Sequence, residues 1–271
     1  MDEDHPLTIE PADLAARLGT AAAPVVLDVR RAPAFAAAET MIVGALSRDP
    51  AEIETWAGAF VATVPADRPV AVYCLHGHEA SRDAAARLRR AGVDARVLAG
   101  GIEAWIEAGL PTRRKLAAGP AWVTRARPKI DRIACPWLVR RFVDPEATFL
   151  YVPADRVMAV AAETGATAYD VPNVAFTHEG GLCSFDAFLK LYGIADPALD
   201  HLAAIVRGAD TGRFELAPQA AGLLAVSLGL SALIADDLAL LDQGMVLYDA
   251  LYTWCRALTG ETHSWPPAMV A

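Results

Sequence analysis

Cys74 is the residue of this 271-residue sequence whose type and position point most directly to chemistry. It ends a valine-rich run, residues 69–74, and precedes a short loop that contains Gly77 and two histidines, after which a helical pattern begins near Ser81. Backbone N–H groups of such a loop and the positive end of the following helix stabilise a thiolate and hold an anion. Cys74 is therefore a candidate nucleophile, and a buried, inert cysteine is the alternative.

The loop after Cys74 supplies the candidate substrate-binding residues, which are Leu75, His76, Gly77, His78, Glu79 and Ala80. Gly77 permits a bend with positive φ, and Ser81 is placed to cap or open the helix. The two histidines either tune the thiolate or are solvated. A phosphatase or arsenate reductase would need an arginine in this loop, where Glu79 or Ala80 stands, so we rank that chemistry lower.

The first part of the chain, residues 7–111, alternates short apolar strands with amphipathic helices. Strands are expected at residues 24–29, 69–74 and 95–100, with helical segments between them. Strand and helix in alternation predict a parallel sheet with helices on both faces. Ligands of such sheets bind at the carboxyl ends of strands, which is where Cys74 lies.

Three motifs occur in order along this part of the chain: VVLDVRRAPAFAAAETMIVGA, YCLHGHEAS and LAGGIEAW. With them, residues 5–113 resemble a single rhodanese-like α/β domain. The resemblance implies that Cys74 is a sulfur-carrying nucleophile within an anion-binding loop, and that Asp28 and Arg30 form a supporting pair. Many active rhodaneses carry a basic residue in the second half of this loop. Here Glu79 stands there, and its charge opposes a dianionic donor such as thiosulfate.

The sequence pattern changes after a charged stretch rich in small residues, which we interpret as a linker at residues 114–121. Residues 122–258 begin with short predicted strands and continue almost wholly as helices, which predicts a mostly α-helical (α+β) second domain. Residues 220–235 carry no charged side chain, but they are too few to span a membrane. We expect them to form a helix buried in a helical core.

The second half also carries ordered motifs, among them WVTRARPKIDRIACPWLVRRFVDPEATFLYVP, YDVPNVAFTHEGGLCSFDAF and LAAIVRGADTGRF. From about residue 122 to residue 256 it resembles the C-terminal family of the chromate-resistance protein ChrB. The two resemblances together match an arrangement of sulfurtransferase and chromate-resistance segments, which introduces chromate as a candidate ligand.

Two groups of polar residues in this half could bind ions. Arg132 and Arg140 have near-helical spacing, which allows both to grip a tetrahedral oxyanion such as chromate, and pairing with nearby carboxylates is the alternative. His178, Asp186 and Asp210 suit a divalent metal, with helix capping and buried hydrogen bonds as the alternative. No stereotyped spacing such as HExxH supports a metal site.

Composition narrows the classes of function. The chain has 24 basic and 33 acidic residues and a net charge of −9, which argues against a nucleic-acid or anionic-membrane surface. Its four cysteines are widely separated and include no CxxC pair, so they fit neither a zinc ribbon nor a disulfide framework. With no secretory signal pattern at the acidic N-terminus, we expect a cytoplasmic protein.

These observations predict a cytoplasmic sulfurtransferase of the rhodanese type, which uses a Cys74 persulfide and is associated with chromate resistance. Its partners would be a small sulfur donor, either a persulfide or thiosulfate, and a thiol acceptor. Sulfur transfer itself requires no cofactor, whereas the second domain is a candidate for a divalent metal. The alternative is a chromate- or metal-responsive sensor in which the rhodanese domain is a non-catalytic binding module.

Overall fold

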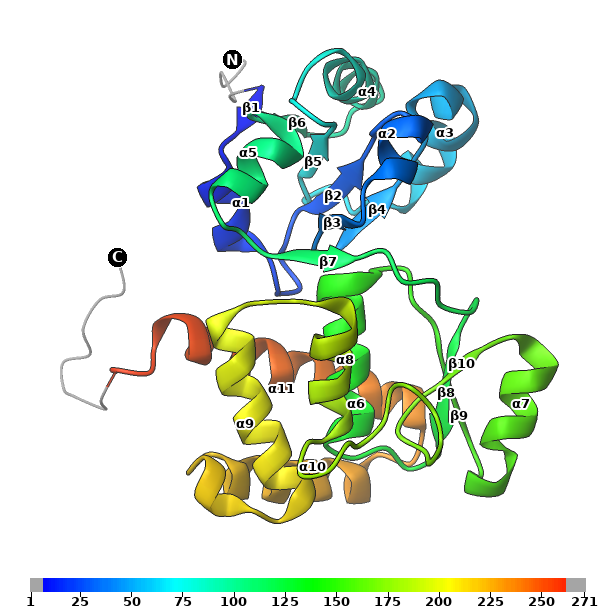
Figure 1. The fold of residues 1–271 in the computed structure, drawn as a ribbon, viewed down its shortest axis with the longest axis vertical. Helices are drawn as coiled ribbons and strands as arrows, with labels where there is room; N and C mark the ends of the chain where they lie inside the picture. Colours follow the sequence, from blue (N-terminus) through cyan, green and yellow to red (C-terminus); the bar gives the residue numbers. More distant parts are fainter. Residues whose placement is uncertain (1–6, 262–271) are drawn as a thin grey trace.

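A five-stranded parallel sheet organises the first half of the chain in the computed structural model, which describes residues 7–261 (Figure 1). The predicted domain start, residue 5, lies outside the described residues. The strand order is β1-β6-β5-β2-β4, and the strands are β1 (Thr8–Ile9), β2 (Val25–Asp28), β4 (Ala45–Ser47), β5 (Val70–Tyr73) and β6 (Ala95–Leu98). The helices around it are α1 (Pro11–Arg17), α2 (Ala32–Ala37), α3 (Ile53–Thr63), which follows a 3₁₀ turn at Pro50–Glu52, α4 (Glu79–Arg90) and α5 (Gly101–Glu107).

Helices cover both faces of this sheet, which confirms the predicted fold class. Alternate residues of a strand point to opposite faces. Ala71 and Tyr73 of β5 belong to the same core cluster as residues of α1 and α5. Val70 and Val72 pack in the other cluster with α3 and α4, and Cys74 lies in that second cluster. The valine-rich character of β5 follows from its burial on both faces.

A short antiparallel ribbon joins the two halves. Strand β7 (Thr112–Arg114) pairs with β3 (Thr40–Ile42), with Met41 opposite Arg113. Arg114, the first residue of the expected linker, is therefore part of this ribbon. The chain then runs without regular structure from residue 115 to residue 121, where the second half begins.

The second half combines a small parallel sheet with a group of helices (Figure 1). The sheet has the order β10-β8-β9, with strands β8 (Trp122–Arg125), β9 (Phe149–Val152) and β10 (Thr167–Ala168). The helices are α6 (Asp131–Leu138), continued by a π-helical turn at Val139–Val143, α7 (Val157–Thr164), preceded by a 3₁₀ turn at Ala154–Arg156, α8 (Ser184–Tyr192), α9 (Pro197–Thr211), α10 (Ala220–Leu233), preceded by a 3₁₀ turn at Phe214–Leu216, and α11 (Asp237–Ala257). This arrangement confirms the mostly helical α+β architecture predicted for the second half.

One hydrophobic cluster runs through both halves, from Leu14 of α1 to Tyr252 of α11. Main-chain contacts reinforce it, because the Gly44 N–H donates to the carbonyl oxygen of Phe142 at 2.7 Å. Gly44 has a φ of +69°, and a Cβ there would lie 2.8 Å from the Arg141 carbonyl oxygen, so the close approach needs glycine. The two halves therefore share a core.

Helix α10 differs from its prediction. The helix forms, but only Ala220, Leu223, Ser227 and Ser231 are buried, whereas Val226, Leu228 and Leu233 are exposed. The expectation that residues 220–235 are buried in a helical core is wrong, because α10 packs mainly on α9 along a single face. Among residues 7–261, no helix has the length and hydropathy needed to cross a membrane.

Candidate functional site

Cys74 follows the last residue of β5 and faces the first turn of α4. Its side chain is 8% exposed, and its Sγ lies 3.2 Å from the hydroxyl oxygen of Ser81. That hydroxyl also lies 3.1 Å from the His78 carbonyl oxygen, to which it can donate. Because a hydroxyl has one proton, Ser81 accepts from the Cys74 thiol or donates to the thiolate, and its rotation accommodates both states.

The surroundings of Cys74 favour its ionised form. Burial by itself raises the pKa of this thiol, but hydrogen bonds from the Ser81 hydroxyl and from the backbone of Ser81, His78 and His76 outweigh burial and lower the pKa below its usual value. The loop and the N-terminus of α4 thus stabilise a negative charge on sulfur. A thiolate in this position is a nucleophile.

Two glycines hold the loop of residues 74–80, called here the Cys74 loop. Gly77 has a φ of +71°, and a Cβ there would lie 2.7 Å from the Leu98 carbonyl oxygen. Gly101, at the start of α5, has a φ of +62°, and a Cβ there would lie 2.5 Å from the carbonyl oxygens of both Cys74 and Leu75. The LAGGIEAW motif therefore allows α5 to approach the loop closely, and sequence reasoning had not assigned Gly101 to the site.

Asp28 and Arg30 form a buried ion pair behind the loop. The Arg30 Nε donates to Asp28 Oδ1 at 2.9 Å, and the Tyr73 hydroxyl donates to Asp28 Oδ2 at 2.8 Å. Arg30 also donates to the Thr40 carbonyl oxygen at 3.0 Å. The pair ties β2 to β5 and β3, and it fixes Tyr73, the residue immediately before Cys74.

The charged side chains of the Cys74 loop turn outward to other partners. His76 Nδ1 lies 2.9 Å from Glu103 Oε2, and the Glu79 carboxylate accepts from Arg31 at 2.6 Å. Glu79 and Ala80 also border a surface cleft of about 610 Å³. The contributions of His76 and His78 to the pKa of Cys74 come from their backbone rather than from their imidazoles.

The predicted oxyanion ligands Arg132 and Arg140 are each engaged elsewhere. Arg132 donates to the carbonyl oxygens of Arg125 and Ala126 and lies 3.4 Å from Asp170. Arg140 donates to the Ala147 carbonyl oxygen and stacks over the Phe149 ring. The structure gives them no common partner among the described residues, so an oxyanion would have to displace contacts within the chain.

The structure divides the predicted metal ligands. Asp186 accepts from the backbone N–H of Cys183 at 2.9 Å and pairs with Arg207 through two bonds of 2.8 and 2.9 Å. It therefore caps α8 and does not join His178. This outcome corrects the predicted set of His178, Asp186 and Asp210, because the arginine of α9 engages both oxygens of the Asp186 carboxylate.

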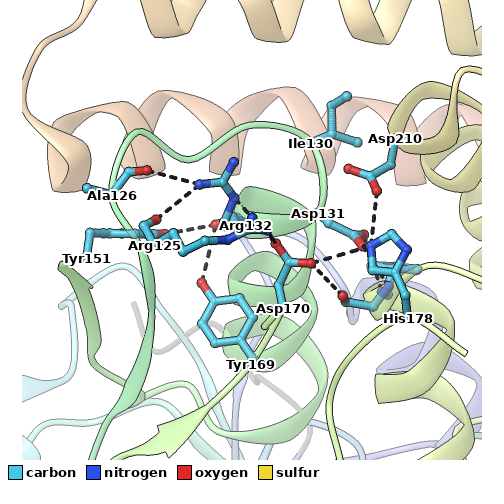
Figure 2. Close-up of polar contacts among 12 residues, drawn as sticks. Arg125, Ala126, Ile130, Asp131, Arg132, Tyr151, Tyr169, Asp170, His178 and Asp210 are labelled. Carbon is cyan, nitrogen blue, oxygen red and sulfur yellow. Dashed lines mark hydrogen bonds and ion pairs between the residues drawn. The ribbon is translucent and has the colours of Figure 1, made fainter. Parts of the chain in front are cut away.

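His178 and Asp210 do meet, together with two further carboxylates (Figure 2). The His178 Nε2 lies 3.2 Å from Asp210 Oδ2 and 3.4 Å from both Asp131 Oδ2 and Asp170 Oδ1. A hydrogen bond to Asp131, opposed by burial and supported by the three negative charges, raises the pKa of His178 to about 9. Burial and the charges of Asp131 and Asp170 raise the pKa of Asp210 to about 7. We call these four residues the His178 cluster.

Asp131 and Asp170 were missed as members of this site. Asp131 begins α6, and Asp170 follows β10 at its carboxyl end, beside the end of β8. The signal that could have pointed to Asp170 is a charged residue next to a short apolar strand, because functional groups of parallel sheets gather at the carboxyl ends of strands.

Comparisons with known proteins identify two domains in the chain. Residues 10–108 match the family model of the rhodanese-like domain, which is the class that the parallel sheet and the Cys74 loop define. Residues 122–255 match the family model of the C-terminal domain of ChrB. The chain is thus a rhodanese-like domain joined to a ChrB C-terminal domain.

The chain is also similar to individual proteins over part of its length. Protein ChrB of Cupriavidus metallidurans is 37% identical over 136 residues, which make up 50% of this chain and 40% of that relative. A rhodanese-related protein from Thermoplasma volcanium is 30% identical with a TM-score of 0.31, and the match covers 39% of this chain and 95% of the other. A protein from Lactobacillus plantarum is 30% identical with a TM-score of 0.35, covering 39% of this chain and 87% of the other. The chain spans about two fifths of the length of the ChrB relative.

Proposed function

We propose that this protein is a sulfurtransferase of the rhodanese type, in which Cys74 carries a persulfide, in a role associated with chromate resistance. The observation that supports it most is the set of hydrogen bonds from the Ser81 hydroxyl and three backbone groups that lowers the pKa of Cys74. A thiolate held in this way attacks sulfur without a separate general base.

In the first half-reaction, the Cys74 thiolate attacks the outer sulfur of a persulfide or thiosulfate donor. The new bond joins Sγ to that sulfur, and the sulfur–sulfur bond of the donor breaks, so that the donor leaves as a thiolate or as sulfite. The charge moves from Sγ to the outer sulfur of the Cys74 persulfide. Loop N–H groups that already hold the thiolate are placed to hold this charge.

In the second half-reaction, a thiolate acceptor attacks the outer sulfur of the persulfide. The acceptor takes that sulfur, and Cys74 returns to its thiolate form, so neither half-reaction needs an added oxidant or reductant. Reduced sulfur delivered in this way would serve the reduction of chromate. The ChrB C-terminal domain in the same chain is what connects the sulfur chemistry to chromate.

The charge of the Cys74 loop suits a persulfide donor better than it suits thiosulfate. The Glu79 carboxylate stands in the Cys74 loop, and Arg31 offsets it only at the exposed surface. The two negative charges of thiosulfate meet more repulsion from this carboxylate than the single charge of a persulfide group. We therefore expect loading from a small-molecule persulfide to exceed loading from thiosulfate.

Mass spectrometry of the intact chain tests the proposal. Incubation with glutathione persulfide should add one sulfur, about 32 Da, to Cys74 and should not do so in the variant Cys74→Ser. Cys255 gives a matched control. Its exposed fraction of 9% is close to the 8% of Cys74, yet burial raises its pKa to about 11. The variant Cys255→Ser should load as fully as the natural chain.

The alternative role as a sensor predicts a different result. If neither persulfide nor thiosulfate adds sulfur to Cys74 at any pH between 6 and 9, the enzyme proposal fails. The rhodanese-like domain would then act as a binding module beside the second domain.

A further inference from the structure

We propose that the His178 cluster binds one divalent metal ion, with Asp131, Asp170, His178 and Asp210 as its ligands. The first argument is the way in which three carboxylates surround one nitrogen. Imidazole Nε2 can donate one hydrogen bond, which in a charged pair measures about 2.7–2.9 Å. Here three oxygens from different segments stand at 3.2, 3.4 and 3.4 Å from this nitrogen, all longer than that range, so one proton on Nε2 cannot satisfy all three.

These separations match the edges of a coordination shell. Bonds of about 2.0–2.2 Å to a divalent ion place neighbouring ligand atoms about 3.0–3.5 Å apart in octahedral or tetrahedral geometry. One ligand atom from each of Asp131, Asp170 and His178 lies within 4.8 Å of the others. Asp210 Oδ2 lies 3.2 Å from the same nitrogen but outside this group of three, so its side chain would turn toward the ion to become the fourth ligand.

The charge of the cluster is the second, independent argument. The Asp131 side chain is 1% exposed and accepts from the backbone N–H groups of Ser184 and Phe185. Among residues 7–261, neither Asp131 nor Asp210 pairs with an arginine or a lysine. Arg125 and Arg132 both contact Asp170 instead. His178 offers Asp131 and Asp210 a single positive charge at most, whereas a divalent ion bound in place of its proton supplies two.

Hydrogen bonds from neighbouring residues orient the proposed ligands, as the hydrogen bonds around metal ligands do in metal sites. The Ser184 hydroxyl donates to Asp170 Oδ1 at 2.9 Å, and its backbone N–H donates to Asp131 Oδ2 at 2.6 Å, so one residue orients two ligands. Ile130, beside Asp131, has a φ of +36°, which is strained for a β-branched residue. Tyr248 holds this segment through a hydrogen bond to the Ile130 carbonyl oxygen at 3.1 Å.

The donor set and the access to it indicate the class of ion. Three carboxylates and one imidazole suit a first-row divalent ion such as Mn²⁺ or Fe²⁺, and also Zn²⁺. His178 is 40% exposed, and Asp170 and His178 line a cavity of about 370 Å³ together with Arg125 and Thr177. The ion can therefore enter from solvent and keep a position open for water or an anion.

Titration of the full chain with Mn²⁺ tests this proposal. After treatment with a chelator and dialysis, calorimetry and the Mn²⁺ spin-resonance signal should show one bound ion per chain, and the ion should raise the melting temperature. The variant Asp210→Asn should lower the affinity by about 100-fold or more, since it removes a direct ligand. Glu179→Gln is the matched control, because this neighbour of His178 pairs with Lys190 outside the cluster. It should bind as the natural chain does.

Two results would overturn the proposal. The first is the absence of binding of Mn²⁺, Fe²⁺ or Zn²⁺ to the natural chain at a metal concentration of about 100 µM, which exceeds the Kd of metal sites that bind in the micromolar range or more tightly. The second is equal affinity in the natural chain and in Asp210→Asn. The spin-resonance measurement needs no variant, so the test holds even if a substitution unfolds the chain. Mn²⁺ binds thiolates weakly, which keeps the Cys74 loop out of the measurement.

Discussion

The Cys74 loop and the His178 cluster are electrostatic opposites within one chain. The Cys74 loop directs backbone groups at a single sulfur and lowers the pKa of its thiol. The His178 cluster directs three carboxylates at a single nitrogen and raises the pKa of His178 to about 9. The first site therefore stabilises an anion, whereas the second attracts a cation.

The two sites also differ in what builds them. The groups that hold the Cys74 sulfur are the Ser81 hydroxyl and the backbone of three residues within one short stretch, 76–81, so the shape of the loop matters more than its exposed side chains. The His178 cluster takes side chains from α6, the end of β10, the loop before α8, and α9. A site made of backbone should be sensitive to the elements that hold the chain in place and tolerant of changes in its exposed side chains. The predictions below test this difference.

The largest effect is expected from the ion pair behind the Cys74 loop. Asp28→Asn leaves the buried guanidinium of Arg30 without its carboxylate and should reduce the free energy of unfolding by about 3–5 kcal/mol. Asp94→Asn is the matched control, because Asp94 pairs with Arg96 at the same spacing of two residues at a more exposed position. It should cost less than about 1 kcal/mol. Urea denaturation measures the free energy of unfolding of both variants. Equal losses in the two variants would show that burial does not strengthen the Asp28–Arg30 pair.

The next effect concerns the backbone contact between α5 and the loop. Gly101→Ala forces a Cβ to within 2.5 Å of two carbonyl oxygens and should cost about 2–4 kcal/mol, from strain at positive φ and from overpacking. Gly109→Ala has a similar φ of +66° with no atom within 4 Å, and should cost only about 1–2 kcal/mol. Alkylation of Cys74 by iodoacetamide should slow in the first variant alone. Equal alkylation rates would show that α5 does not shape the loop.

The difference between the two sites also explains which of their residues could be predicted from the sequence. The Cys74 loop lies in one contiguous stretch, so its nucleophile and its parallel sheet could be predicted from the order of strand, loop and helix. Three of the four residues of the His178 cluster are more than 30 positions from Asp131, and only tertiary packing brings them together. The sequence therefore placed His178 and Asp210 in a candidate site but could not tell that Arg207 engages Asp186. It also could not predict that α10 leaves apolar residues exposed, because that depends on which helices cover it.

A smaller effect is expected from Ser81, whose side chain hydrogen-bonds to the Cys74 sulfur. Ser81→Ala removes the hydroxyl 3.2 Å from Sγ and should raise the pKa of Cys74, because the thiolate loses a donor. Alkylation at pH 7 should fall about tenfold, which corresponds to about 1.4 kcal/mol. The pH profile of the rate should shift to higher pH, while the rate at high pH, where the thiol is fully ionised, stays nearly unchanged. A loss of rate at every pH would instead indicate a displaced loop.

The smallest effect is expected at the exposed pair of His76 and Glu103. Their side chains meet at 2.9 Å in solvent, so Glu103→Gln should change the free energy of unfolding by less than about 1 kcal/mol. The backbone N–H of residue 103 still donates to the Leu75 carbonyl oxygen in this variant, which preserves the loop. Alkylation of Cys74 at pH 7 should remain within about twofold of the natural rate, because His76 acts on the sulfur through its backbone. A tenfold change would mean that the imidazole itself tunes the thiolate, and the Cys74 loop would then depend on side chains as the His178 cluster does.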